Sequence, residues 1–527
     1  MRSFLISIHP KIKIPVLILL LYVIVATAGI SGSIYILDEA KNAECAREMM
    51  ESGNYIIPGF NYELRTDKPP LHYFFMLLSY KIFGISSWSA RFFSIVFGAL
   101  SLLITYFFVK KWLGIKSAYF SSLVLISSLH FGVFFHMAVP DPYLLFFFTA
   151  SLFLFFESLQ EKNRFAAMGM YICLALGALS KGPIAVLLPG FIMLLYLLLS
   201  KKLQSSTIWG LKPISGLLIF AAIALPWYLL VHRETHGEWT HGFFFEHNLE
   251  RFASTKEGHG GSFLMASGFV LMGLFPFSIF LVRALSHAYR NKKKDVLLFA
   301  LVAGLTITLF FSLSSTRLPN YTAPAYPFFA ILIGSLLAKQ KQPAYRWELI
   351  VLFIVAILIV TAGYFALDIE KQYTFLKPQL LLLLPGIIGA GFALKLYKKR
   401  TLNFTIHLIS YSFILLSFFL SEIVFFQIAK QNPVTLSLPY INKDEPIACY
   451  KKFNPSYPFY LKQKIIKLES IESIKDFLQN HPDACVISTS KSLQDANYSE
   501  FAVKIFEQKD VFENRTTVIL KNKLTKN

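Results

Sequence analysis

The feature that most constrains this chain is a series of long apolar segments separated by short polar connections. A helix that crosses a bilayer needs roughly 20 predominantly apolar residues, and we count about thirteen segments of that kind. Hydrophobic residues make up 55% of the chain and charged residues 16%, which excludes an ordinary soluble globular protein. The sequence therefore predicts an all-α polytopic membrane protein. The predicted spans lie near residues 13–36, 88–109, 116–136, 142–158, 164–180, 183–200, 212–231, 263–284, 295–313, 321–338, 347–367, 377–396 and 404–428.

Two apolar stretches near the N-terminus need a separate interpretation. The run from Lys11 to Ile36 is too long for the core of a signal peptide and has no small-residue cleavage site before Asp38, so we expect it to be retained as the first span. The run 71–84 is apolar but too short to cross a bilayer. We expect it to lie in the membrane interface or to re-enter.

The distribution of lysine and arginine predicts the orientation. Each even-numbered span ends in a basic cluster, and cytoplasmic connections carry an excess of these residues, so the N-terminus is predicted to be cytoplasmic. An odd number of spans then places the C-terminal tail outside. The net charge of +20 fits this topology and contact with membrane lipid; no basic stripe stands apart from an apolar span, which argues against a nucleic-acid partner.

The last part of the chain has a different composition. From about residue 432 it becomes polar, and short β-branched runs alternate with one helical pattern, as in a small α/β domain. We therefore predict a membrane domain over residues 1–431 and a periplasmic α/β domain over residues 432–527. The predicted strands lie at 446–450, 464–468, 484–488 and 517–521, with a helix at 469–480.

The external connections hold the residues that suggest chemistry. The main external loops are 38–87 and 232–262, and shorter external turns follow other spans. Ionisable groups at span ends are costly and usually pair or line a cavity. Acidic groups beside lysine and arginine suit a substrate that combines a sugar with a phosphate. The candidate site residues in these external connections are Asp38, Glu39, Lys41, Asp67, Lys68, Asp141, Lys181, His247, Arg251 and Tyr321.

Each of these residues also has an ordinary structural interpretation. Asp38 is well placed to cap an amphipathic helix over Ala40 to Met50, which Gly53 would end, and such a helix would suit the membrane interface. Asp141 before a proline is typical of a turn, and Lys181 can extend its side chain to the interface. The gathering of all these groups on one predicted face is what favours a functional site.

At these positions the chain resembles a known family. The motifs occur in the family's order over about residues 30–340. They resemble bacterial lipid A aminoarabinose transferases of the ArnT type and related protein O-mannosyltransferase-like membrane glycosyltransferases of the GT-C class. The motifs are Asp38-Glu39-Ala40, TDKPPLHYFF, SSWSARFFS, VPDPYLLFF, SKGPIAVLLPG, FFFEHNLERF and STRLPNYTAPAYPFFAIL.

The resemblance implies a function and a set of roles. Such enzymes move a sugar from a polyprenyl (undecaprenyl) phosphate carrier to an acceptor at the outer face of the inner membrane, without a nucleotide cofactor. It assigns the role of the essential catalytic carboxylate to Asp38. It also assigns catalytic roles to Glu39 and Asp141. It assigns substrate binding to Lys41, Lys68, Lys181, Arg251 and Tyr321, and a divalent metal, zinc rather than magnesium, to Asp67 and His247. Lys41 stands where the family commonly has arginine, and Asp67 where it often has glutamate.

Several alternatives stay open at this point. The acceptor is expected to be lipid A, but a protein or glycan hydroxyl fits the same donor chemistry. Asp38 would act as general base on a hydroxyl acceptor, whereas an anionic phosphate acceptor would leave it to orient the sugar or to stabilise positive charge on it. A transporter is a weaker alternative, because no inverted repeat or pair of broken helices is evident. A scaffold would not need these residues together.

Overall fold

The computed structural model describes residues 10–249, 262–339, 345–369, 371–399, 401–494, 497–511 and 514–523. The chain divides into two compact units, which we describe separately. The membrane unit comprises Met1–Ala28, Thr66–His72 and Phe93–Glu422. The loop–tail unit comprises Gly29–Arg65, Tyr73–Phe92 and Ile423–Asn527. The tail thus groups with most of the first loop in one unit, while Thr66–His72 of that loop belongs to the membrane unit. The sequence-based division at residue 431 places the whole loop in the membrane domain.

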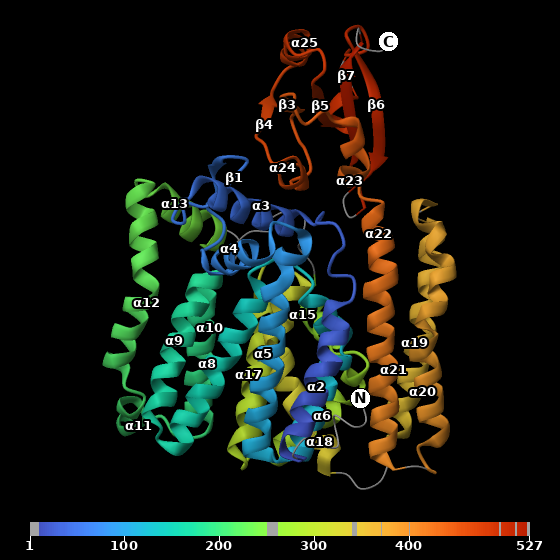
Figure 1. Ribbon diagram of the computed structural model, residues 1–527. Coiled ribbons are helices and arrows are strands. Elements are labelled where there is room, and N and C mark those ends of the chain that lie inside the picture. Colours follow the sequence, from blue (N-terminus) through green and yellow to red (C-terminus); the bar gives the residue numbers. More distant parts are fainter. Residues whose placement is uncertain are drawn as a thin grey trace. The chain divides into compact units, whose positions relative to one another are not determined.

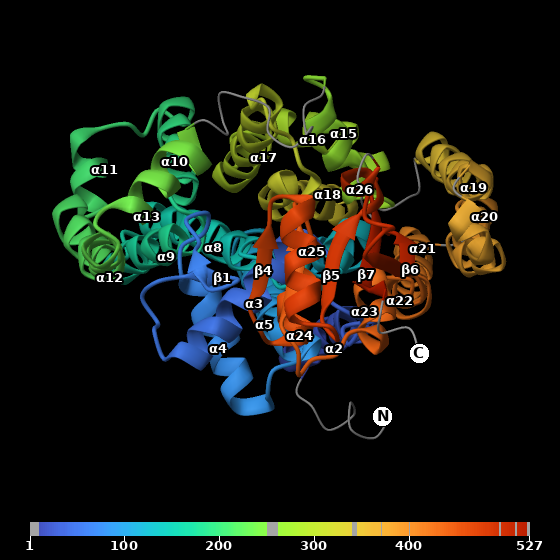
Figure 2. The ribbon, with the colours of Figure 1, turned by 90° about the horizontal axis from the view of Figure 1, so that it is seen from above.

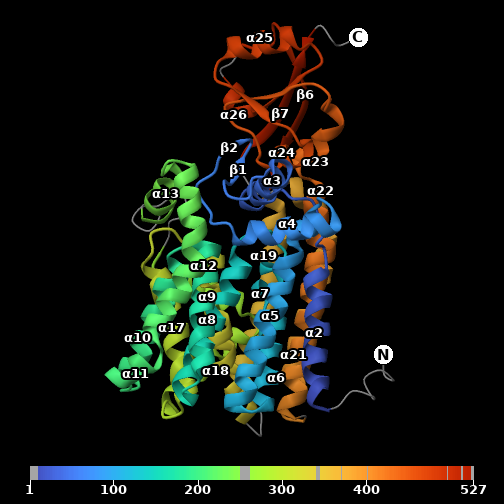
Figure 3. The same cartoon turned by 60° about the vertical axis from the view of Figure 1, so that its left-hand side comes forward.

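The membrane unit consists of helices, and each predicted span overlaps one or more of them. The first helix ends at Thr27, well before the predicted end of the first span at residue 36. The principal elements are α2 (Pro10–Thr27), α5 (Ser87–Leu113), α6 (Ile115–Ser127), α7 (Leu129–Phe134), α8 (Asp141–Glu161), α9 (Arg164–Lys181), α10 (Ile184–Leu199), α11 (Ser205–Gly210), α12 (Pro213–Glu234), α13 (Glu238–His241), η1 (Gly242–Leu249), α15 (Met265–Gly273), η2 (Phe277–Phe280), α16 (Leu281–Arg290), α17 (Asp295–Leu313), η3 (Pro319–Ala325), α18 (Tyr326–Lys339), α19 (Arg346–Ile369), η4 (Lys371–Leu383), α20 (Leu384–Leu396) and α21 (Leu402–Phe419). Figures 1 and 3 show α8, α9 and α10 side by side.

Length and composition identify a multi-pass membrane protein. Among the described residues, eight helices are long and apolar enough to cross a bilayer, and a ninth is added if Met265–Gly273 and Phe277–Arg290, bent by 114°, form one span. The helices α6 and α10 are apolar but shorter. The predicted all-α membrane architecture is therefore confirmed, whereas the number thirteen stays a prediction.

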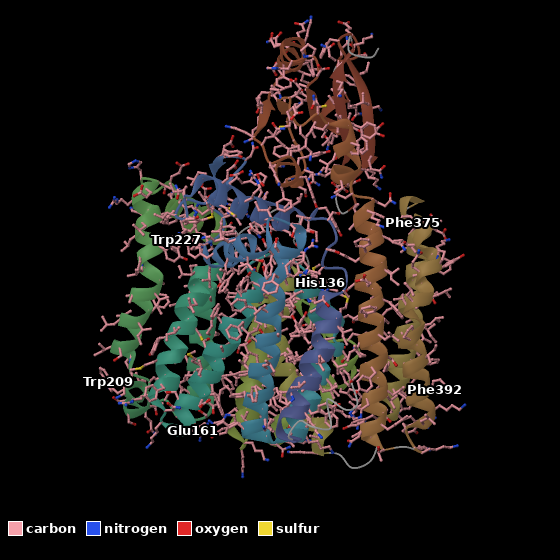
Figure 4. The ribbon with its side chains drawn as sticks, in the orientation of Figure 1. His136, Glu161, Trp209, Trp227, Phe375 and Phe392 are labelled. Atoms are coloured by element: carbon pink, nitrogen blue, oxygen red, sulfur yellow. The ribbon has the colours of Figure 1, made fainter. Side chains whose placement is uncertain are left out.

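The helices differ in how deeply they are buried. The apolar window of η3 and α18 is 89% buried, against 17% for α19. A Cβ added at Gly334 of α18 would lie 2.2 Å from Ser121 Oγ on α6, so this glycine permits the two helices to approach closely. Figure 2 shows α12 and α19 at opposite edges of the unit. Phe392 of α20, labelled in Figure 4, is 50% exposed, as expected for a lipid-facing helix.

The tail folds into the predicted α/β domain. Its sheet has the strand order β4-β3-β5-β7-β6, in which β3 runs parallel to β4 and β5. The helix α25 (Ile471–Asn480) begins at Ser470 with a capping box and buries Ile474 and Leu478 against the sheet. Figure 2 shows this helix lying across the strands. The strands are β3 (Ile447–Tyr450), β4 (Ile465–Leu468), β5 (Cys485–Thr489), β6 (Ala502–Lys509) and β7 (Thr516–Asn522).

The four predicted strands and the helix are confirmed, but β6 was missed. A register shift between Lys504 and Phe506 interrupts the alternation of apolar and polar residues that identifies a strand. Cys449 and Cys485, on neighbouring strands, are free thiols. Their burial raises the pKa of both, that of Cys449 to about 11.

The first loop contains a helix that is longer than predicted and that buries charged side chains. The helix α3 (Leu37–Ser52) buries Glu44, Arg47 and Glu48 among its apolar residues, so it lacks the separate apolar face of an interfacial helix. Asp38 lies in its first turn, where the helix dipole favours a carboxylate as predicted, but the N-cap position belongs to Ile36 and not to Asp38. Gly53 ends the helix with a φ of 68°, as predicted. The apolar run 71–84 forms α4 (Leu71–Phe83), which is too short to span.

Candidate active site

The membrane unit contains a cavity of about 620 Å³ whose walls are mostly apolar. Aromatic and aliphatic side chains from α7, α10, η1 and α17 form these walls. Charged and polar groups enter the cavity at the start of α8, the end of α9 and the turn before α4. Glu161, labelled in Figure 4, marks the opposite end of α8. The ionisable and polar lining residues are Asp67, Lys68, Asp141, Lys181, His247, Ser314, Thr316, Asn320 and Tyr321.

Two prolines hold Lys68 at the cavity. Pro69 and Pro70 lack backbone N–H groups and keep residues 65–70 out of regular structure until α4 begins. Lys68 is only 8% exposed, and its Nζ lies 3.7 Å from Asp67 Oδ2. A buried ammonium with one distant carboxylate neighbour is suited to a further anionic partner.

A second cation lies where two helix ends meet. Asp141 occupies the first turn of α8, where the helix dipole favours a carboxylate, and Lys181 is the last residue of α9, where it favours a cation. Lys181 Nζ lies 2.6 Å from Asp141 Oδ1 and 4.9 Å from the centroid of the Tyr321 ring. The acid and the aromatic ring together fix the ammonium at the cavity wall.

Two glycines bring the segment 238–249 to this cavity. Gly182, with φ of 75°, ends α9, and a Cβ there would lie 2.4 Å from Phe243 Cζ. Gly242 packs on Thr66, where an added Cβ would lie 2.7 Å from its hydroxyl. Both contacts require the absence of a side chain. They explain why η1 supplies Phe243 and His247 to the same cavity as Lys68.

Asn320 is a lining residue that the sequence analysis did not single out. His130 on α7 places its Nε2 3.0 Å from Asn320 Oδ1, while its Nδ1 lies 2.6 Å from the Tyr326 hydroxyl. This chain of polar contacts orients the amide at the cavity. The signal was present, because Asn320 is part of the quoted motif RLPNY, next to Tyr321.

The structure brings together six of the ten predicted site residues. These are Asp67, Lys68, Asp141, Lys181, His247 and Tyr321. Arg251 lies outside the described residues. Asp38, Glu39 and Lys41 belong to the loop–tail unit.

In the loop–tail unit Glu39 forms a buried ion pair. Arg91 Nε and Nη2 donate to its two carboxylate oxygens at 2.7 and 2.8 Å, and Arg91 Nη1 donates to the carbonyls of Ile30 and Gly32. Both charged side chains are 1% exposed. This pairing favours a structural role for Glu39 over the catalytic one. Asp38 is exposed and Lys41 half-buried.

The cavity in the membrane unit is chemically suited to a lipid phosphate. Lys68 and Lys181 supply two positive charges within apolar surroundings, where electrostatic contacts are stronger than in water. Apolar walls accept hydrocarbon. Asp67 and His247 line the same cavity and are acceptable ligands for a divalent metal, although the described residues contain no group of three or more candidate ligands.

Comparison with known proteins gives a consistent result. The family model described as dolichyl-phosphate-mannose-protein mannosyltransferase matches residues 67–230. An uncharacterised protein of Aquifex aeolicus (strain VF5) is 31% identical over 58% of this chain and 68% of its own length. The undecaprenyl phosphate-alpha-4-amino-4-deoxy-L-arabinose arabinosyl transferase 2 of Proteus mirabilis (strain HI4320) is 30% identical over 56% of this chain. The chain spans about half (54%) of the length of that arabinosyl transferase.

A solved structure shares the fold along nearly the whole chain. ArnT from Cupriavidus metallidurans, in a crystal structure bound to undecaprenyl phosphate, has a TM-score of 0.83 and 19% identity, covering 96% of this chain and 97% of that one. The fold and the relatives define a membrane glycosyltransferase of the GT-C class. Within that class the chain is similar to the ArnT-type arabinosyl transferases over 56% of its length.

Proposed function

We propose that this enzyme transfers a sugar from a polyprenyl phosphate carrier to a lipid A-type acceptor at the periplasmic face of the inner membrane. The observation that carries the proposal is the pair of cations, Lys68 and Lys181, in a cavity whose walls are otherwise mostly apolar. A carrier phosphate and its hydrocarbon need these two environments side by side. The names of the arabinosyl transferase relatives and the undecaprenyl phosphate bound to the related ArnT support the same donor.

The proposed reaction is a displacement at the anomeric carbon with inversion. The acceptor oxygen forms the new bond to that carbon, and the carrier phosphate leaves with the bonding electron pair. Lys68 and Lys181 stabilise the charge that grows on the departing phosphate, while Asp141 holds Lys181 in place. Tyr321 positions Lys181 through its ring. By resemblance we assign Arg251 to the same phosphate and Lys41 to substrate binding.

Asp38 is our candidate for the essential carboxylate, by the same resemblance. Replacing it with alanine is expected to reduce transfer more than tenfold, because a positioned acid–base group contributes about 10² or more. Asp38 is exposed, so the variant is expected to insert and fold normally. Near wild-type turnover by the purified variant would remove Asp38 from the mechanism.

A second candidate acceptor is a protein or glycan hydroxyl. It is favoured by the family model, whose description names transfer of mannose to protein, over residues 67–230. Incubating membranes with a labelled polyprenyl-phosphate sugar separates the two candidates. Label in lipid A supports our proposal, and label in protein or another glycan supports the alternative. Label that stays in the carrier, with lipid A and protein both present, contradicts both.

We also propose that Asp67 and His247 share one divalent metal ion, with zinc fitting this ligand pair better than magnesium. The metal ion would have a structural role, because it would hold the turn that carries Lys68 against η1. Metal analysis of the purified protein is the test, with His247→Ala as the comparison. We expect stoichiometric metal in the wild type and its loss in the variant. A metal-free wild type that keeps its activity and thermal stability in chelator would contradict this.

A further inference from the structure

A second cavity lies at the other end of α17 and α18 from the candidate active site. It measures about 360 Å³ and is lined by the connection between α5 and α6, the start of α17 and the end of α18. The active-site cavity uses the opposite end of α17, at Phe310 and Phe311. Since α17 has 19 residues, the two ends are about 28 Å apart. The two cavities are therefore separate sites.

Three lysines surround the second cavity without an acidic partner. Lys116, Lys294 and Lys339 come from three different helix ends and line it together. Within the described part of the chain none of them forms an ion pair with a carboxylate. Asp295, which follows Lys294, is instead paired with Lys202 at 2.7 Å. Three converging like charges repel one another unless an anion lies between them.

Two buried hydrogen-bond donors also line the cavity. Ser335 is 1% exposed, and its hydroxyl has no hydrogen-bond partner among the described residues. The indole Nε1 of Trp112 is likewise buried and unpartnered there. A buried donor without an acceptor costs about 1–3 kcal/mol, so both groups favour a ligand that brings oxygen acceptors.

The backbone adds a third kind of donor. Gly114, with φ of 88°, turns the chain into α6, and no side chain caps that helix end. The first N–H groups of a helix carry partial positive charge and bind anions. Ser117, in the first turn, already donates its hydroxyl to the Leu113 carbonyl at 3.1 Å and keeps that turn closed.

Membrane topology alone explains only part of this arrangement. Lysines are expected at cytoplasmic span ends. That expectation does not account for a cavity whose lining residues include Ser335 and Trp112, each with a buried donor that has no partner among the described residues. Ile115, which lines the cavity, is 44% exposed. It places an apolar side chain beside the charges, as a bound lipid chain would require.

We propose that this cavity is a binding site for a phosphate group, supplied either by the headgroup of an anionic phospholipid or by free phosphate. The three lysines neutralise its charge, and the Ser335 hydroxyl and the Trp112 indole N–H donate to its oxygens. The site belongs to the helix ends remote from the sugar-transfer cavity. It stands independently of the proposed function, because it uses none of the same residues.

The test compares two double variants that remove the same charge from the same region. Lys294→Gln with Lys339→Gln removes two cavity lysines, whereas Lys292→Gln with Lys293→Gln removes two exposed lysines of the adjacent loop that do not line the cavity. Native mass spectrometry counts phosphatidylglycerol retained by each purified protein. We expect wild type and the loop variant to retain it and the cavity variant to bind at least tenfold more weakly, with Ser335→Ala intermediate.

A second arm separates the two sources of phosphate. Inorganic phosphate at millimolar concentration is added to delipidated protein, and the thermal midpoint is followed. A rise in wild type that is absent from the cavity variant, without lipid retention, assigns the site to free phosphate. Retained lipid without that rise assigns it to the headgroup. Binding of neither probe to the wild type, or an equal loss of binding in the two double variants, would overturn the proposal. If the cavity variant does not fold, Ser335→Ala takes its place in the comparison with the loop variant.

Discussion

At the scale of single residues, the site depends on how Lys181 is held. Its ammonium contacts one carboxylate at 2.6 Å and one aromatic ring at 4.9 Å, and both partners come from other helix ends. The sequence singled out Lys181, Asp141 and Tyr321 separately, and each had an ordinary alternative. Only the fold shows that the three form one cluster.

This cluster predicts non-additive effects on transfer. Asp141→Asn leaves Lys181 without its carboxylate, and Lys181→Gln removes the cation that Asp141 holds, so each is expected to lower kcat/KM at least tenfold. The double variant should lose little more than the worse single variant, because the two residues act as a unit. Losses that simply multiply would show that Asp141 and Lys181 act independently.

What the sequence could predict at this scale was limited to residue type and rough position. The quoted motifs identified six residues that line one cavity. They contain Asn320 but did not single it out, and the contact of its amide with His130, 190 residues away along the chain, is visible only in the fold. They also did not distinguish the role of Glu39 from that of Asp38, because only the structure shows that Arg91 pairs with Glu39.

At the scale of elements, the first loop is held by two different kinds of ion pair. Glu39 and Arg91 are each 1% exposed, whereas Glu63 and Lys467, which join the first loop to the tail, are about half exposed. Breaking a buried pair leaves an uncompensated charge and costs roughly 3–5 kcal/mol. An exposed pair contributes about 0–1 kcal/mol.

Arg91→Gln is therefore expected to destabilise the protein strongly, by roughly 3–5 kcal/mol, since it strands the Glu39 carboxylate and two backbone carbonyls. Lys467→Gln is the matched control and should change stability by less than about 1 kcal/mol. Thermal unfolding in detergent measures both. Similar midpoints for the two variants would contradict the structural role of the Glu39–Arg91 pair.

Glu48 on α3 predicts a dependence on pH. Its burial, and then the neighbouring charge of Glu44, raises the pKa of Glu48 to about 8, while the backbone N–H of Tyr62 donates to both its oxygens. A carboxyl whose pKa is raised in the folded state contributes stability that is fully present below the unfolded value near 4.5 and is lost as pH rises through about 8.

As the pH rises from about 4.5 to about 8, the thermal midpoint of the wild type should therefore fall, and Glu48→Gln should flatten that fall. Glu51→Gln is the control, because a hydrogen bond from Tyr62 lowers the pKa of Glu51, which shifts stability in the opposite sense. Unchanged pH dependence in Glu48→Gln would mean that another group titrates.

The elements themselves were mostly predictable, because apolar periodicity identifies long helices and short strands. Two failures have physical causes. The bulge in β6 broke the alternating pattern. The helix α3 was expected to segregate polar from apolar residues, but it buries Arg47 between Glu44 and Glu51, so pairing replaces segregation.

At the scale of the whole molecule, the predicted external location of the site depends on one orientation in the membrane. The basic clusters that end even-numbered spans predict a cytoplasmic N-terminus and an external tail. Hydropathy predicted the membrane class and the order of the helices correctly. It cannot count spans reliably where a helix is short, as α6 and α10 are, or sharply bent.

Cysteine labelling in intact spheroplasts tests this orientation. A cysteine placed at Lys293 should be protected from a membrane-impermeant reagent, and one placed at Asn442 should be labelled. The native cysteines serve as background, because Cys45, Cys449 and Cys485 are buried and Cys173 is half-buried. Labelling of both positions, or only of the first, would reject the thirteen-span topology.

The most direct test of the central claim is turnover of a polyprenyl-phosphate-linked sugar by the purified protein in proteoliposomes, followed as release of polyprenyl phosphate. Release by the wild type is expected when an acceptor is present. Lys68→Gln is expected to lower this release at least tenfold, because we propose that Lys68 stabilises the leaving phosphate. Lys162→Gln, at the far end of α8, should keep wild-type activity. No release from any pentose or hexose donor, or equal release by Lys68→Gln, would contradict the account.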